Sequence, residues 1–110
     1  MPTLDELMSL PGVYGAVEFS CMGELGQVRG ELDRDFAELI AHMCAANMAT
    51  YRMQATGWTK LTAQQGFLPE RGFVFVTLDH AVMGMNGNAV LAHRKDFDYD
   101  AAYRLFNAAA

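Results

Sequence analysis

Apolar and polar positions divide the first part of the chain into one short helix and two strands. Thr3 can cap a helix that runs to about Ser9, because acidic residues occupy its first turn and a Pro-Gly pair follows it. Residues 13–20 and 25–32 then alternate apolar and polar side chains on either side of a short turn. This pattern predicts a β-hairpin with one face exposed to water.

The middle of the chain has the period of a long helix. Asp33 or Asp35 can cap its start, and we expect it to run to about Thr56 and to end at Gly57. Residues 57–71 follow neither a helical nor a strand period. They predict an irregular connection with room for one short strand.

Three more strands and a final helix complete the pattern. Residues 72–78, 80–85 and 88–95 are predicted strands, and Asn86-Gly87 between the last two is a strong hairpin signal. Residues 96–108 predict a helix with acids at its positive end. The order α-β-β-α-β-β-β-α predicts an α+β fold: a five-stranded antiparallel sheet with a long central helix and a short helix at each end.

Size and composition favour one domain that has a partner. The chain of 110 residues is predicted to form a single domain over residues 1–110. Hydrophobic residues make up 52% of it and charged residues 19%, and surplus apolar surface on a small domain often serves an interface. The net charge of −5 argues against nucleic acid and anionic membranes as partners. Every apolar run is too short for a membrane span.

The N-terminal residues and the cysteines predict a cytoplasmic protein. The first residues carry acids where a secretion signal needs bases, and no long apolar stretch follows them. Cys21 falls in a predicted turn and Cys44 in the long helix. We therefore expect both thiols to stay reduced and unpaired.

Residues 41–53 (AHMCAANMATYRM) concentrate side chains that can bind soft metals. His42 and Cys44 are two positions apart, which places them about 200° apart around a helix, so they cannot share an ion. The methionines do not align along one face either. Core and interface packing is the better interpretation. One broad apolar side of the helix collects Phe36, Leu39, Ile40, Met43, Cys44, Asn47, Thr50, Tyr51 and Gln54.

Four alanines follow an i, i+4 ladder on the other, less apolar side of this helix: Ala37, Ala41, Ala45 and Ala49. Small residues allow a second helix to approach closely. Alanine is also the best helix former on a surface in contact with water. The sequence leaves both interpretations open.

Two further groups of residues suggest metal ligands. A two-residue turn at Asn86-Gly87 would pair His80 with His93, whose Cβ atoms would lie about 5 Å apart, close enough to share a divalent ion. The sequence supplies no obvious third ligand, so two half-exposed histidines at strand ends are the favoured interpretation. The acids at 96, 98 and 100 lack the glycine and glutamate of a calcium loop and fit a helix N-terminus better.

No nucleophile, base or glycine-rich motif has a recognisable catalytic spacing. The sequence therefore gives no positive support for an enzyme and predicts no cofactor.

The element order and length resemble the Roadblock/dynein light chain superfamily. Three stretches resemble more narrowly a small bacterial family of uncharacterised proteins within it: LMSLPGVYGAVEFS, HMCAANMATYRMQATGW and VMGMNGNAVLAH. The resemblance implies a homodimer that pairs strands edge to edge and sets two central helices side by side. It also implies a scaffold or regulatory platform, in some relatives for small GTPases, and no enzyme. The connection at 57–71 departs from better-studied relatives.

Two hypotheses follow. The first is a non-catalytic homodimeric interaction or regulatory module, in which strand 73–78 is a free edge. Its predicted dimer interface consists of Ala41, Ala45, Met48, Ala49, Phe73, Phe75 and Thr77. The alternative is a small ligand- or metal-binding protein that uses a pocket near residues 57–71 or the His80/His93 pair.

Overall fold

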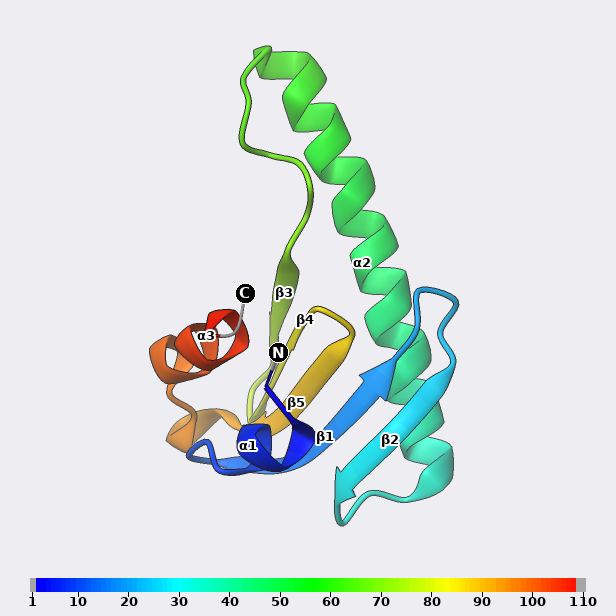
Figure 1. Ribbon diagram of the computed structural model, residues 1–110, viewed down its shortest axis with the longest axis vertical. Coiled ribbons are helices and arrows are strands. Elements are labelled where there is room, and N and C mark those ends of the chain that lie inside the picture. The colour runs from blue at the N-terminus through cyan, green and yellow to red at the C-terminus, as the bar shows by residue number, and fades with distance from the viewer. Residues whose placement is uncertain (1, 109–110) are drawn as a thin grey trace.

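A computed structural model describes residues 2–108 and has the predicted α+β architecture (Figure 1). The predicted domain, 1–110, includes three residues outside that range. The elements in chain order are α1 (Leu4–Met8), β1 (Val13–Phe19), β2 (Leu25–Gly30), α2 (Arg34–Thr62), β3 (Gly72–Val76), β4 (His80–Met85), β5 (Asn88–His93), a 3₁₀ turn (Arg94–Asp96) and α3 (Tyr99–Asn107).

The five strands form one antiparallel sheet in the order β2-β1-β5-β4-β3. The predicted hairpin between β4 and β5 is confirmed, because Asn86 and Gly87 both have positive φ, 57° and 83°, as a type I′ turn requires. Met85 consequently faces Asn88. β3 lies at one edge of the sheet, as predicted, and β2 at the other.

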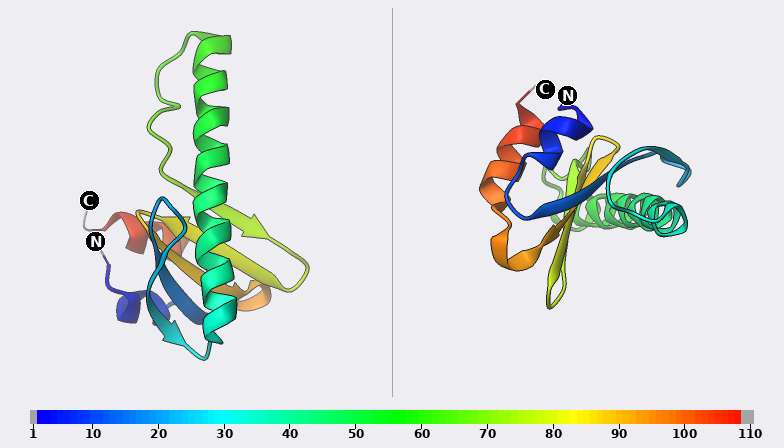
Figure 2. Two further views of the ribbon diagram at one scale, coloured as in Figure 1. Left: turned by 90° about the vertical axis from the view of Figure 1, so that its right-hand side faces the viewer. Right: turned by 90° about the horizontal axis from the view of Figure 1, so that it is seen from below.

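Helices cover both faces of the sheet (Figure 2). α2 packs on one face over a core that includes Val17, Cys44 and Leu91. α1 and α3 pack on the other, where Phe106 is buried. The prediction that the first hairpin has a water-exposed face was therefore wrong at Ala16, which is fully buried beneath the terminal helices.

The predicted end of α2 at Gly57 was also wrong. The helix continues to Thr62 and ends at Ala63, which adopts the left-handed conformation (φ 56°) and donates its N–H to the Thr59 carbonyl. A glycine inside a helix costs about 1 kcal/mol relative to alanine. Good helix formers lie a few positions away on both sides of Gly57 and offset that cost: Gln54, Ala55, Lys60 and Leu61.

α2 sets the long dimension of the molecule and extends well past the sheet (Figure 1). The molecule measures 44 × 30 × 27 Å, and a helix of 29 residues is roughly 43 Å long at about 1.5 Å per residue. Residues 63–71 return beside the overhanging part. Trp58 stacks on Phe67 with ring centroids 6.2 Å apart, and Arg52 pairs with Glu70.

None of the helices within residues 2–108 combines the length and hydropathy needed to cross a membrane.

Candidate functional site

The edge strand β3 is apolar and unprotected. It carries no charge and no proline, and Val74, Phe75 and Val76 are each about half exposed. An edge strand offers free N–H and C=O groups to another strand, and proteins usually protect such an edge with charge, proline or a bulge. Within the described residues, nothing of that kind covers β3.

The outward side of α2 continues this apolar surface. Phe36, Leu39 and Met43 are 42%, 55% and 45% exposed. Met43 and Phe75 line one shallow groove of about 120 Å³ between α2 and the sheet, so the helix and the strand form one surface. We call this the α2–β3 surface. It comprises Phe36, Leu39, Met43 and Phe75, while Val74 and Val76 lie on the other face of β3 and belong to its exposed edge.

The alanine ladder lies on the opposite side of α2 from the one predicted. Ala37 and Ala41 are fully buried and Ala45 is 8% exposed, all three in the core against the sheet. Small side chains let the helix backbone approach the strands, which leaves the bulkier Phe36 and Leu39 to face outward. Placing the ladder on the less buried side was wrong for these three alanines.

The seven residues of the predicted interface therefore fall into two groups. Within the protomer, Ala41 and Ala45 are core residues, and Phe73 is buried beside Tyr51. Phe75 and Thr77 lie exposed at or just after the β3 edge. Met48 is half-buried and Ala49 is exposed, and both line a separate pocket. Their contact with a second copy stays a prediction.

The predicted interface omitted Phe36, Leu39 and Met43, although all three belong to the broad apolar side of the helix for which core and interface packing was predicted. The width of that side, which exceeds what one sheet face can cover, favoured an interface but did not show which of its residues face outward.

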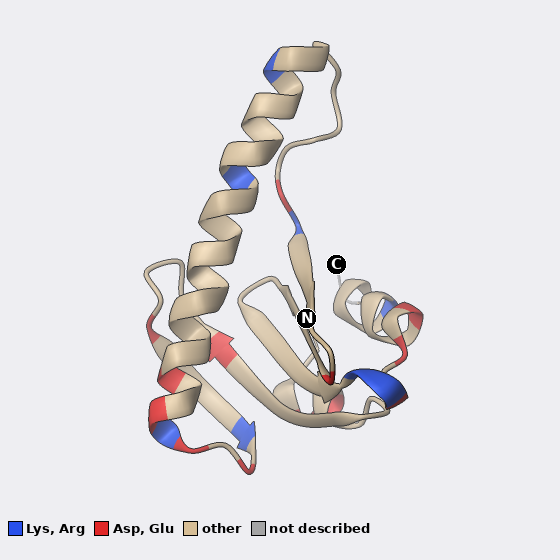
Figure 3. Ribbon diagram, turned by 180° about the vertical axis from the view of Figure 1, so that it is seen from behind, with Lys and Arg blue, Asp and Glu red and all other residues tan. Residues whose placement is uncertain are grey.

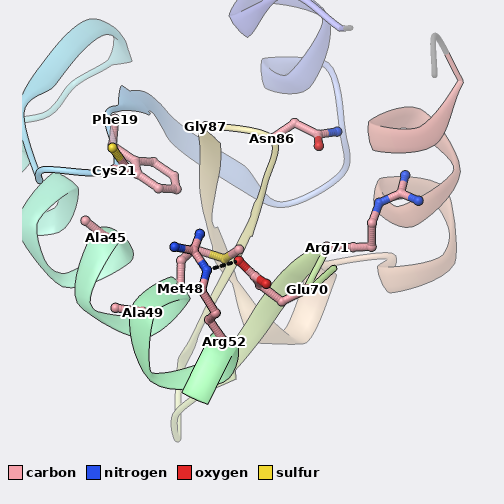
Figure 4. A pocket seen from close by; sticks show the side chains of 10 residues that line it. All are labelled: Phe19, Cys21, Ala45, Met48, Ala49, Arg52, Glu70, Arg71, Asn86 and Gly87. Carbon is pink, nitrogen blue, oxygen red and sulfur yellow. Dashed lines mark hydrogen bonds and ion pairs between the residues drawn. The ribbon is translucent and has the colours of Figure 1, made fainter. Parts of the chain in front are cut away.

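A pocket of about 280 Å³ lies between α2, the β4–β5 turn and the end of the 63–71 connection, close to where the alternative hypothesis expected one (Figure 4). Arg52 donates to Glu70 across 2.6 Å, and this hydrogen bond is the main reason why the pKa of Glu70 is lowered. Arg71 points away and donates to Asn107. Both arginines in the lining are thus engaged with protein groups. The pocket is a weaker candidate for a charged ligand than its composition suggests.

The two histidines of the alternative metal site are paired as the two-residue turn at Asn86-Gly87 predicted. His80 faces His93 across β4 and β5, and both are exposed. Of the calcium-like acids, Asp98 caps α3 by accepting the Ala101 N–H at 3.0 Å.

Comparison with solved structures confirms the fold that the sequence resembles. A Roadblock/LC7 domain from Streptomyces avermitilis superimposes with a TM-score of 0.70 at 22% identity, over 92% of this chain and 82% of that one. Myxococcus xanthus MglB gives a TM-score of 0.65 at 13% identity, over 88% and 76% of the two chains. A comparison with curated proteins finds no match. Residues 3–108 match one sequence family, and the chain belongs to it: the family described as "Uncharacterized conserved protein (DUF2173)".

Proposed function

We propose that this protein is a homodimeric interaction or regulatory scaffold, without catalytic activity of its own, that assembles through the α2–β3 surface. The observation that carries the proposal is the unprotected apolar edge of β3 beside the exposed apolar side of α2. One two-fold axis would cover both at once. Each β3 would pair antiparallel with its copy, and the two α2 helices would pack across the axis.

Charge supports a copy of the same chain as the occupant. A two-fold interface places each patch against itself, so charges of one sign would repel. α2 has no lysine, arginine, aspartate or glutamate between Glu38 and Arg52, and β3 has none at all. Figure 3 shows this long uncharged stretch of α2 beside an uncharged β3. The remaining surface, with its net negative charge, would stay outside the dimer.

The resemblance to Roadblock-like domains adds a second class of partner, another protein such as a small GTPase. A cytoplasmic location fits the two free cysteines, Cys21 and Cys44.

Light scattering at micromolar concentration tests the dimer. Wild type should have a mass of about 24 kDa, twice the 12.1 kDa chain. Leu39→Glu should be a folded monomer, because Leu39 is exposed in the protomer and a charge there would be desolvated only in the dimer. Met22→Glu is the matched control. Met22 is 75% exposed in the turn between β1 and β2, at the edge of the sheet opposite β3, so this variant should stay dimeric.

A monomeric wild type would refute the proposed dimer. A Leu39→Glu protein that stays dimeric, together with a Val76→Lys protein that also does, would show that any dimer forms elsewhere. Circular dichroism of each variant establishes that it is folded.

A further inference from the structure

Three strands bring Tyr14, His80 and His93 together at one end of the sheet, on the face that α2 packs against. The main-chain hydrogen bonds show how closely the histidines approach. His93 donates its N–H away from β4, to Gly12, and Arg94 donates to Asp79. His80 and His93 are therefore a non-hydrogen-bonded pair, the kind in which opposed side chains lie closer. Their ring centroids are 5.8 Å apart.

Tyr14 holds both imidazoles in place. Its ring centroid is 4.8 Å from that of His93, and its hydroxyl lies 3.1 Å from Nδ1 of His80. When Nδ1 carries the proton it donates to the hydroxyl oxygen, which leaves the lone pair of Nε2 free. Histidine ligands of metals commonly have such a partner on their other nitrogen.

We propose that His80 and His93 form a two-imidazole site for a divalent transition-metal ion, oriented by Tyr14. Imidazole nitrogens bind such ions at about 2.0–2.1 Å, so two ring nitrogens that converge on one ion come to about 3–3.5 Å of each other. Rings spaced like these can meet that requirement by small rotations. The fold adds Tyr14 from β1, which is far from both histidines in sequence, as an orienting partner and not as a third ligand.

The ligand set also defines the class of ion. Within residues 2–108 no cluster of three histidine, cysteine or acidic side chains exists. The site therefore leaves several coordination positions to water, unlike a closed structural zinc site. Imidazole favours Cu²⁺, Ni²⁺ and Zn²⁺ over Mg²⁺ and Ca²⁺, which prefer oxygen ligands, and Cu²⁺ should bind most tightly.

Calorimetric titration with Cu²⁺ and with Zn²⁺ tests the site, using protein without an affinity tag in a Cys21→Ser background, which removes the exposed thiol as a competing ligand. We expect one ion per chain and a loss of at least tenfold in affinity for both His80→Gln and His93→Gln. His42→Gln is the matched control. It removes the third histidine, which lies on α2 against Gly23, and should leave binding unchanged.

Two further measurements separate orientation from ligation. Tyr14→Phe keeps the aromatic ring but removes the hydroxyl, and should weaken binding about tenfold. The electron paramagnetic resonance spectrum of bound Cu²⁺ should show two imidazole nitrogens, reduced to one in His93→Gln. Equal binding by wild type and His93→Gln, or no binding by wild type, would overturn the site. The dimer is measured separately and does not depend on either result.

Discussion

The alanines of α2 act at the scale of single residues by setting how closely the helix lies on the sheet. Ala37 and Ala41 have no exposed surface, and large apolar side chains at neighbouring positions face outward instead. Interiors are packed densely, so an added methylene group at such a position forces the backbone or a neighbour to move. The ladder is therefore a packing device within the protomer.

Enlarging one of these alanines should destabilise the fold. Ala41→Leu should lower the free energy of unfolding by about 1–3 kcal/mol, because the added side chain has no space between α2 and the sheet. Glu38→Leu, at an exposed position of the same helix that points away from the proposed interface, should change it by less than about 0.5 kcal/mol. Urea unfolding of both variants measures the difference. Equal stability of the two would mean that the helix does not approach the sheet through Ala41.

The burial of Ala45 changes the meaning of Ala45→Glu. Because Ala45 belongs to the predicted dimer interface, this substitution would be a test of a helix contact between copies if the residue were exposed in the protomer. Ala45 lies in the core, so the glutamate would bury an unpaired charge at a cost of several kcal/mol and unfold the protomer.

The two cysteines should differ strongly in reactivity. Cys44 is 2% exposed, and burial raises its pKa to about 12, so almost none of it is thiolate at pH 8. Cys21 is exposed. Iodoacetamide labelling of native protein, read by mass spectrometry, should modify Cys21 quickly and Cys44 only on unfolding. Fast modification of Cys44 in native protein would contradict its place between α2 and the sheet.

At the scale of elements, Gly57 lies inside α2 and no longer marks its end. A Cβ atom added there would meet nothing within 4 Å, and the backbone is helical. The helix therefore bears the entropic cost of a glycine without using its conformational freedom.

Gly57→Ala should raise the free energy of unfolding by roughly 0.5–1 kcal/mol. Gly30→Ala is the contrasting variant, because Gly30 has a positive φ of 89° and a Cβ there would collide with the Tyr14 carbonyl. It should be clearly destabilised. Thermal unfolding followed by circular dichroism checks both, and a loss of stability in Gly57→Ala would place the end of α2 where the sequence suggested.

At the scale of the whole molecule, association and folding should be linked. A dimer that loses its interface on unfolding is stabilised by mass action, so the Tm of wild type should rise with protein concentration. The Tm of Leu39→Glu should not depend on concentration, because that variant lacks the interface. Calorimetric scans over a hundredfold range of concentration measure this. A wild-type Tm independent of concentration would argue against a dimer that unfolds as it dissociates.

The local features of the fold were predictable from the sequence because short-range chemistry decides them. Thr3 and Glu6 form a reciprocal capping box at α1. Asn86 and Gly87 suit the positive φ angles of a type I′ turn, and that turn sets the register in which His80 faces His93. Each of these depends on residues a few positions apart in the chain.

The tertiary structure alone decided the features that depend on which elements pack against each other. A helical wheel ranks the sides of α2 by polarity, but the side that faces the sheet combines Ile40 and Cys44 of the apolar side with the small alanines. The small Ala41 allows a closer approach than Leu39. The same holds for Ala16, which is buried because α1 and α3 cover it. Tyr14 meets His80 only through strand pairing across the sheet. Sequence spacing determines angle and register within an element, and packing between elements determines which surfaces meet.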